Sequence, residues 1–207
     1  MKEILVEAIG TFFLVLVIGL SVIPPDAGAL APLAIGAALM VMVYAGGHVS
    51  GAHYNPAVTL AVWRRGKLDT KLVAPYMGAQ FGGAFLAAKV VSYLKHQLYL
   101  TPMRPDVTPA IIVEVLFTFA LAYVVLNVAT SKKTAGNSFY GLAIGMTLMV
   151  GAYAAGKISG GMLNPAVALA ATVMGLTVQA DLWMWLVANF AGGALAAEVF
   201  RLTSGEK

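Results

Sequence analysis

The sequence predicts an all-α membrane protein with six transmembrane helices and two re-entrant half-helices, arranged as an inverted repeat. Three observations predict this fold. The chain is 60% hydrophobic and only 11% charged, whereas soluble domains carry about 25% charged residues. Long apolar runs recur along the chain, and two Asn-Pro pairs interrupt them at corresponding places. We therefore expect a single transmembrane domain over residues 1–207, with internal repeats at about 1–100 and 108–207.

The six expected spans are apolar runs of about 20 residues, the length that crosses a bilayer core. They cover about 4–23, 29–47, 72–94, 109–130, 138–156 and 181–200. Two shorter apolar stretches, about 56–63 and 165–175, follow the Asn-Pro pairs and are too short to span. The first run lacks a basic segment and a small-residue cleavage site, so we expect it to be retained as a span.

The repeat is visible in matching segments of the two halves. EAIGTFFL (7–14) resembles EVLFTFAL (114–121), LAIGAALMVMVYAGG (33–47) resembles LAIGMTLMVGAYAAG (142–156), and AQFGGAFLAA (79–88) resembles ANFAGGALAA (188–197). Each half holds three spans, and because three is odd, the second half must enter the membrane from the opposite side. Inverted repeats of this kind are typical of transporter folds. The small residues of the third pair favour close helix packing.

Basic residues predict the orientation of the chain in the membrane. One side carries Arg64, Arg65, Lys67, Lys71, Lys132 and Lys133, and the other side carries only Lys95, Arg104 and Lys157 in its loops. The positive-inside rule then places both termini in the cytoplasm, and we expect the cell membrane as the location. The net charge of +4 is modest and lies between the apolar runs, so no nucleic-acid partner is expected.

The two Asn-Pro pairs read as helix starts. Asn is a favoured N-cap residue, and Pro is tolerated at the first helical position. We therefore expect Asn55 to cap a short helix from Pro56, and Asn164 to cap one from Pro165. In an inverted repeat the two helices enter from opposite faces and their N-termini meet near the midplane. Each N-terminus carries a partial positive charge, and we expect each Asn to keep its NH2 group free to donate into a water-filled cavity.

The segment HVSGAHYNPAVT (48–59) resembles the signature of the aquaporins, the major intrinsic protein family, and the likeness runs from Glu7 to Ala197. Its two pore motifs are Asn55, Pro56 and Ala57, and Asn164, Pro165 and Ala166. The resemblance implies a homotetramer with one pore per subunit and passive flow of water or small neutral solutes. It also implies that backbone carbonyls line the pore at Gly51, Ala52, His53, Gly160, Gly161 and Met162. His48 resembles the family histidine that helps to hold the first loop.

The sequence departs from the family pattern at the expected selectivity filter. Most aquaporins have Arg after the second Asn-Pro-Ala, and this chain has Val167. Counting outward from the two Asn residues gives Ile35, Ala152 and Gly161 as the other filter positions, and strict water channels usually have His where Ala152 stands. Such a filter has no charged side chain. We expect it to be wider and more apolar than a strict water filter.

Glu7 and Glu114 need an explanation, because a carboxylate within a span is costly. They are either proton-relay groups of an ion-coupled carrier or acceptors that brace the re-entrant loops, and their symmetric placement and the family resemblance favour the brace. The chain contains no cysteine. His48 and His53 have no carboxylate neighbours in sequence, so no metal site or other cofactor is expected.

The function expected from these features is a passive channel for water and small uncharged solutes. The alternative is a facilitator mainly for glycerol, ammonia or neutral metalloid hydroxides such as arsenite, with low water flow. An ion-coupled secondary transporter is a further class, with only Glu7 and Glu114 as candidates for the coupling site. A membrane junction protein would need large adhesive loops, and the loops here are short. The chain matches no zinc-protease, Walker or dinucleotide motif, so we do not expect an enzyme.

Overall fold

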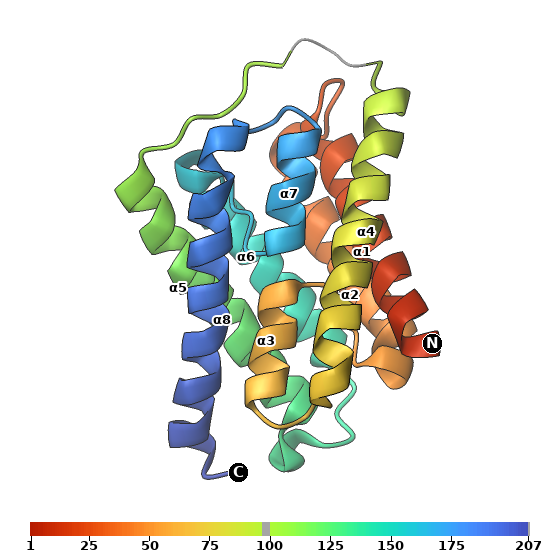
Figure 1. The fold of residues 1–207 in the computed structure, drawn as a ribbon, viewed down its shortest axis with the longest axis vertical. Coiled ribbons are helices and arrows are strands. Elements are labelled where there is room, and N and C mark those ends of the chain that lie inside the picture. The colour runs from red at the N-terminus through yellow and green to blue at the C-terminus, as the bar shows by residue number, and fades with distance from the viewer. Residues whose placement is uncertain (97–99, 207) are drawn as a thin grey trace.

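The computed structural model describes residues 1–96 and 100–206, over which the chain forms eight α-helices (Figure 1). The six long helices are α1 (Lys2–Val22), α2 (Ala31–Ser50), α4 (Thr70–Leu94), α5 (Val107–Val125), α6 (Tyr140–Ser159) and α8 (Leu182–Ser204). The two short ones are α3 (Pro56–Arg64) and α7 (Pro165–Val173). Three 3-10 turns lie at Gly28–Leu30, Lys132–Thr134 and Gln179–Asp181, and a π-helical turn covers Leu126–Thr130. The predicted fold class is confirmed.

The two short helices lie one above the other in the middle of the molecule, each with its N-terminal end toward the other (Figure 1). Each short helix packs against a long helix of the opposite half: α3 against α8, and α7 against α4. The long helices pair in the same symmetric way, α1 with α4 and α5 with α8, while α2 packs against α6 across the halves. The two half-helices are therefore held by a frame that both halves supply.

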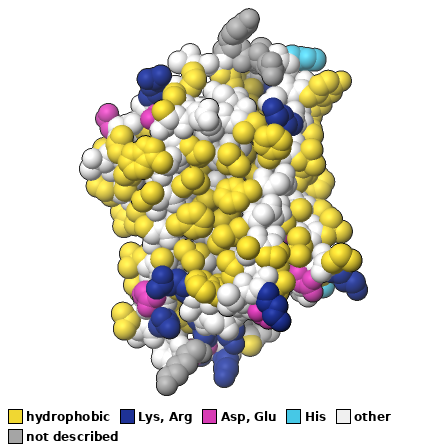
Figure 2. Space-filling view, in the orientation of Figure 1, with side chains coloured by type: hydrophobic (Ala, Val, Ile, Leu, Met, Phe, Trp, Pro, Cys, Tyr) yellow, Lys and Arg dark blue, Asp and Glu magenta, His cyan; other side chains and the backbone are white. Residues whose placement is uncertain are grey.

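The surface has the banding of a membrane protein. Hydrophobic side chains cover the middle of the face shown in Figure 2, and charged side chains gather toward the two ends. Among the described residues, five helices are long and apolar enough to cross a membrane, namely α1, α2, α5, α6 and α8 with their flanking turns. The sixth, α4, is longer than most at 25 residues but less apolar, because it includes Lys71, Gln80 and Lys89.

Glycines permit the closest helix contacts. A Cβ added to Gly83 of α4 would stand 2.4 Å from the carbonyl oxygen of Ala8 in α1, and one added to Gly193 of α8 would stand 2.4 Å from that of Ala57 in α3. A Cβ on Gly82 would meet nothing within 4 Å. The expected small-residue packing thus depends on one glycine of the pair in α4 but on both Gly192 and Gly193 in α8, because a Cβ on Gly192 would stand 2.6 Å from the carbonyl oxygen of Val115.

The predicted spans match the helices within a few residues, and the differences have local causes. The second and fifth spans were expected to end at Gly47 and Gly156, but α2 and α6 continue to Ser50 and Ser159. Each ends at the next glycine in the left-handed region, Gly51 at φ 84° and Gly160 at φ 89°. The second short helix ends at Val173 rather than at residue 175, because Gly175 adopts φ 78° and turns the chain.

Candidate functional site

The loops that enter the two half-helices have matching backbone conformations. Ala52 and Tyr54 in the first loop adopt φ of 50° and 48°, and Gly161 and Leu163 in the second adopt 61° and 51°. Three of these four residues carry a side chain, which makes the left-handed region unfavourable by about 1–2 kcal/mol each. Both loops then reach an extended Asn N-cap, at φ −156° and −159°. Strained loops of this kind persist only where the surrounding structure holds them.

A buried glutamate holds the first loop. Glu7 of α1 is fully buried, and its Oε1 accepts from Ser50 Oγ at 2.7 Å and from the backbone N–H of His53 at 2.9 Å. Its Oε2 accepts from the backbone N–H of Tyr54 at 2.7 Å and from Gln80 Nε2 at 2.8 Å. All four donors converge on one carboxylate, so both of its oxygens face the loop and its supports.

Glu114 of α5 makes the corresponding set of contacts in the second half. Its Oε1 accepts from Ser159 Oγ at 2.7 Å and from Met162 N at 2.8 Å. Its Oε2 accepts from Leu163 N at 2.8 Å and from Asn189 Nδ2 at 2.7 Å. Glu114 is also fully buried, and neither glutamate lines the cavities described below.

Several supporting residues escaped the sequence reasoning. Gln80 and Asn189 donate to the two glutamates, while the Tyr76 hydroxyl donates to Ser50 O at 3.0 Å and Trp185 Nε1 donates to Ser159 O at 2.9 Å. A signal for the first pair was present, because Gln80 and Asn189 occupy the same position in the repeated segments AQFGGAFLAA and ANFAGGALAA. A polar side chain kept in both copies of an otherwise small and apolar segment indicates a buried hydrogen bond.

Asn55 and Asn164 cap the half-helices and also cross-link them. Asn55 Oδ1 accepts from Ala57 N at 2.8 Å, and Asn164 Oδ1 accepts from Ala166 N at 2.9 Å. The NH2 groups are not wholly free, which corrects the expectation. Asn55 Nδ2 donates to the carbonyl oxygen of Leu163 at 2.8 Å, and Asn164 Nδ2 donates to that of Tyr54 at 2.9 Å. Because an amide NH2 has two hydrogens, one N–H of each Asn remains available for a molecule in the cavity that both line.

A cavity of about 390 Å³, called here the outer cavity, is lined by the four expected filter residues. Ile35, Ala152, Gly161 and Val167 all line it, together with Asn55 and Asn164. Its mouth includes Thr101, Met103 and Thr177, where Met103 N donates to Leu176 O at 2.8 Å and ties the loop before α5 to the end of α7. Apart from His53, no ionisable side chain other than tyrosine lines this cavity among the residues that the structure describes. The wall thus offers apolar side chains on one part and polar loop groups on the other.

The residues expected to line the pore through their carbonyls divide between two cavities. Gly160, Gly161, Met162 and His53 line the outer cavity, whereas Gly51 and His53 line an inner cavity of about 500 Å³. Ala52 lines neither cavity, and it is 4% exposed.

His48 does not hold the loop. It lies exposed in the last turn of α2 and makes no hydrogen bond with any residue that the structure describes. The first loop and the end of α2 are held instead by Glu7, which accepts from His53 N and Tyr54 N, and by the Tyr76 hydroxyl, which donates to Ser50 O. Within the described residues, no group of three or more His, Asp or Glu side chains is placed to hold a metal ion.

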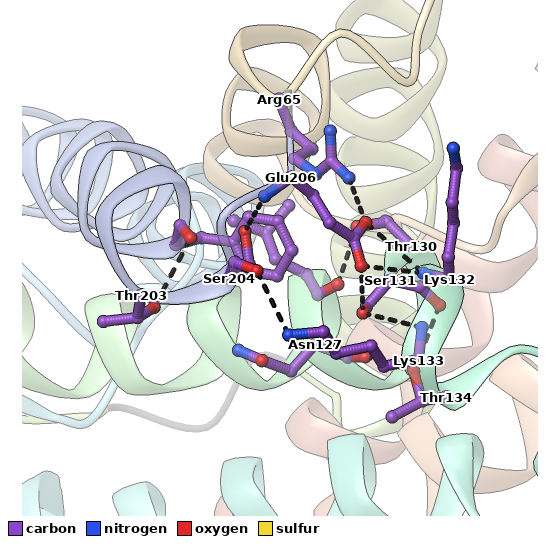
Figure 3. A network of polar contacts seen from close by, with 12 residues as sticks. Arg65, Asn127, Thr130, Ser131, Lys132, Lys133, Thr134, Thr203, Ser204 and Glu206 are labelled. Atoms are coloured by element: carbon purple, nitrogen blue, oxygen red, sulfur yellow. Dashed lines mark hydrogen bonds and ion pairs between the residues drawn. The ribbon is translucent and has the colours of Figure 1, made fainter.

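A network of polar contacts around Glu206, called here the polar clasp, joins it to Arg65, Ser131 and Lys132 (Figure 3). The Arg65 side chain is 1% exposed, and its guanidinium contacts Glu206 Oε2 at 2.7 Å and lies 4.8 Å from the centre of the Phe200 ring. Glu206 Oε1 accepts from Ser131 Oγ at 2.8 Å and from Lys132 N at 3.1 Å. The Ser131 hydroxyl, the Lys132 amide and the Arg65 charge lower the pKa of Glu206 below its ordinary value of 4.5. The clasp joins the ends of α3, α5 and α8, and the neighbouring residues Val62, Lys67, Ala129 and Thr130 line the inner cavity.

Comparison with known proteins gives consistent matches. The sequence model of the major intrinsic protein family matches residues 1–200. The chain is 35% identical to the putative aquaporin NIP4-1 of Arabidopsis thaliana, over 97% of this chain and 74% of the relative. It is 38% identical to aquaporin NIP1-1 of Oryza sativa, over 82% of this chain and 61% of the relative. The X-ray structure of the aquaglyceroporin from Plasmodium falciparum superposes with a TM-score of 0.81 at 22% identity, covering 98% of this chain and 96% of that one.

Proposed function

The chain belongs to the major intrinsic protein family, and from that membership and the geometry of its cavities we propose how this member handles its solutes. It is a multi-pass integral membrane protein and a passive channel for water and small uncharged solutes, not an enzyme. The proposal concerns the solute range: this channel admits uncharged solutes larger than water, of the size of glycerol or arsenite, in addition to water.

One observation carries the proposal. The four filter residues line a single cavity of about 390 Å³ without an Asp, Glu, Lys or Arg side chain among its described lining residues. An Arg at the position of Val167 would add a long side chain and five hydrogen-bond donors, and a His at the position of Ala152 would add a ring. Neither is present, so the outer wall neither narrows the path with a large side chain nor fixes a positive charge there.

The polar and apolar parts of the wall suit such a solute. The loop carbonyls and the remaining N–H of each Asn offer hydrogen bonds to the solute. Ile35, Leu39 and Val167 offer it apolar contacts. Apolar constrictions also tend to expel water. We therefore expect water flow to be modest for the size of the opening, and a facilitator with low water flow remains the second candidate.

We assign Glu7 and Glu114 to bracing the loops. The four donors on each carboxylate, and the absence of both glutamates from the described cavity walls, support this role. A coupling-ion site of a secondary transporter would need at least one carboxylate oxygen turned toward the permeation path.

The assembly and orientation belong to the same proposal. We expect a homotetramer in the cell membrane, with both termini in the cytoplasm. The basic residues Arg64, Arg65, Lys132 and Lys133 at the end of the molecule that holds the clasp support this orientation, because cytoplasmic loops are enriched in Lys and Arg. Crosslinking in membranes and protease access to a C-terminal tag test these two points.

The function is tested by reconstitution. Purified protein in liposomes is compared with empty liposomes for osmotic water flow and for uptake of glycerol, urea and arsenite by light scattering. We expect flux of at least one solute larger than water, without accumulation against its gradient. Rapid water flow with exclusion of every larger neutral solute would contradict the proposed solute range.

A further inference from the structure

The outer and inner cavities have two lining residues in common, His53 and Val125, among the residues that the structure describes. The outer cavity is continuous from Thr101 at the mouth, past the four filter residues and the Asn pair, to this point. The inner cavity reaches the same point from Lys67 and Asp69. The two cavities therefore meet at His53 and Val125, whereas the four filter residues all line the outer cavity.

We propose that His53 and Val125 form the constriction that sets the upper size limit for solutes in this channel. This inference rests on the proposed function, because it assumes that uncharged solutes larger than water enter the outer cavity. The sequence indicates size selection at the outer filter, whereas this inference places it where the outer cavity meets the inner cavity. The outer residues then act as an entrance that does not reject solutes by size.

The His53 ring is fixed in place by a chain of hydrogen bonds. Its Nδ1 lies 3.2 Å from Thr59 Oγ1, and that hydroxyl accepts from Gln80 Nε2 at 2.8 Å. Gln80 Nε2 also donates to Glu7 Oε2, so the ring is linked to the same carboxylate that holds the loop. The ring of Tyr76 contacts it edge-on, with the ring centres 5.3 Å apart. An anchored ring makes a constriction of defined width, whereas a freely rotating ring would swing aside.

The other ring nitrogen is available to a passing molecule. His53 Nε2 lies 3.2 Å from the point where a Cβ on Gly51 would stand, and Gly51 lines the inner cavity. Whichever nitrogen carries the proton, Nδ1 is occupied by Thr59 and Nε2 is the polar atom left for the permeating molecule. Gly51, at φ 84°, keeps the space beside Nε2 open.

Val125 supplies the apolar side of the constriction. It is the last residue of α5, 4% exposed, and the π-helical turn Leu126–Thr130 follows directly. Single π-helical turns are frequent at functional sites. A polar atom on one side and two methyl groups on the other suit a small neutral solute that keeps one hydrogen bond as it passes.

Two substitutions test the constriction independently. Val125→Ala removes two methyl groups from α5, and His53→Ala removes the ring. Stopped-flow light scattering on proteoliposomes measures permeability to water, glycerol and the longer polyol erythritol. We expect Val125→Ala to raise the erythritol-to-water permeability ratio about tenfold, the lower end of what one methylene is worth in discrimination by an apolar pocket, and Val125→Ile to lower it.

The matched control is Val43→Ala. Val43 of α2 is buried, at 1% exposure, and it lines neither cavity. Its substitution removes the same two methyl groups and is expected to leave the ratio unchanged. If Val125→Ala and Val43→Ala both leave the ratio at the wild-type value, the constriction is not at this point and the inference is overturned. If the wild-type protein passes no solute larger than water while Val125→Ala does, the inference holds and the proposed solute range fails.

Discussion

Replacing Glu114 with Gln tests whether the buried carboxylates are braces. The change keeps the shape of the side chain but turns one acceptor oxygen into an NH2 group. If the NH2 takes the place of Oε1, the Ser159 hydroxyl can turn toward Ala155 O, which already lies at 3.4 Å, but the Met162 N–H is left without an acceptor. If it takes the place of Oε2, the Asn189 amide can flip to present its unpaired Oδ1, but the Leu163 N–H is left without one. Either placement leaves one buried backbone N–H facing a donor.

The magnitude follows from these contacts. A buried N–H without an acceptor is unfavourable by about 1–3 kcal/mol, and each of the other three bonds loses about 1 kcal/mol when its acceptor becomes neutral. The sum is about 4–6 kcal/mol of unfolding free energy. At about 2–4 °C per kcal/mol for a chain of this size, we expect the melting temperature to fall by about 10–20 °C. Glu7→Gln should behave alike, because either His53 or Tyr54 would then lack an acceptor.

The assay is thermal unfolding of purified protein in detergent, combined with solute flux into liposomes that carry a pH gradient. Glu3→Gln is the matched control, because Glu3 lies on the same helix as Glu7 but its side chain is 43% exposed. We expect the control to keep the wild-type melting temperature and all variants to show flux that is independent of the pH gradient. A Glu114→Gln protein as stable as the wild type, or uphill solute accumulation that this variant abolishes, would refute the brace and favour an ion-coupled carrier.

Three further predictions follow from other parts of the molecule. Val167→Arg should reduce glycerol flux about tenfold or more and water flux less, because the longer side chain narrows the cavity and hinders the larger solute more than water. Equal loss of both fluxes would contradict this. Flow should resist mercury salts, since the chain has no cysteine, and a rapid, thiol-reversible block would mean that the assay reports another protein. Glu206→Gln should remove a part of the stability that depends on pH. The contacts with Ser131, Lys132 and Arg65 lower the pKa of Glu206. Their stabilisation is therefore present above the ordinary pKa of Glu and is lost as the pH falls through the lowered pKa. Melting temperatures of wild type and variant between neutral and acidic pH should therefore converge as the pH falls.

Much of the fold followed from a few local signals. The apolar runs gave the six long helices, and each Asn-Pro pair gave a half-helix start at the correct residue, because an N-cap followed by Pro is a strong local preference. The helix ends were less accurate. The second and fifth spans were predicted to end at Gly47 and Gly156, yet α2 and α6 continue past them, since tertiary packing tolerates glycine in a helix. Gly46 is in fact required to be small, because a Cβ there would clash with the Tyr54 hydroxyl.

The contacts between the two halves could not be predicted in the same way. Each Asn amide donates to the carbonyl of the residue before the other Asn, and a backbone carbonyl leaves no trace in the sequence. The expectation that both NH2 groups are free was therefore wrong in part, because one N–H of each Asn is used in this contact. The expectation for His48 failed for a different reason: its role came from resemblance alone, and its side chain lies exposed in the last turn of α2.

The position of the constriction depends on still subtler features. Counting outward from the Asn residues locates side chains that line the pore, but it does not rank them by the space they leave. Val125 is one apolar residue among many in α5, and the π-helical turn that follows it has no obvious sequence signal. His53 stands out in the sequence, but its role as a wall depends on Thr59 and Gln80, which fix its ring from two other helices. A filter that has lost its Arg and His therefore does not by itself imply a channel without a size limit, because a second pair of residues further along the same path can impose one.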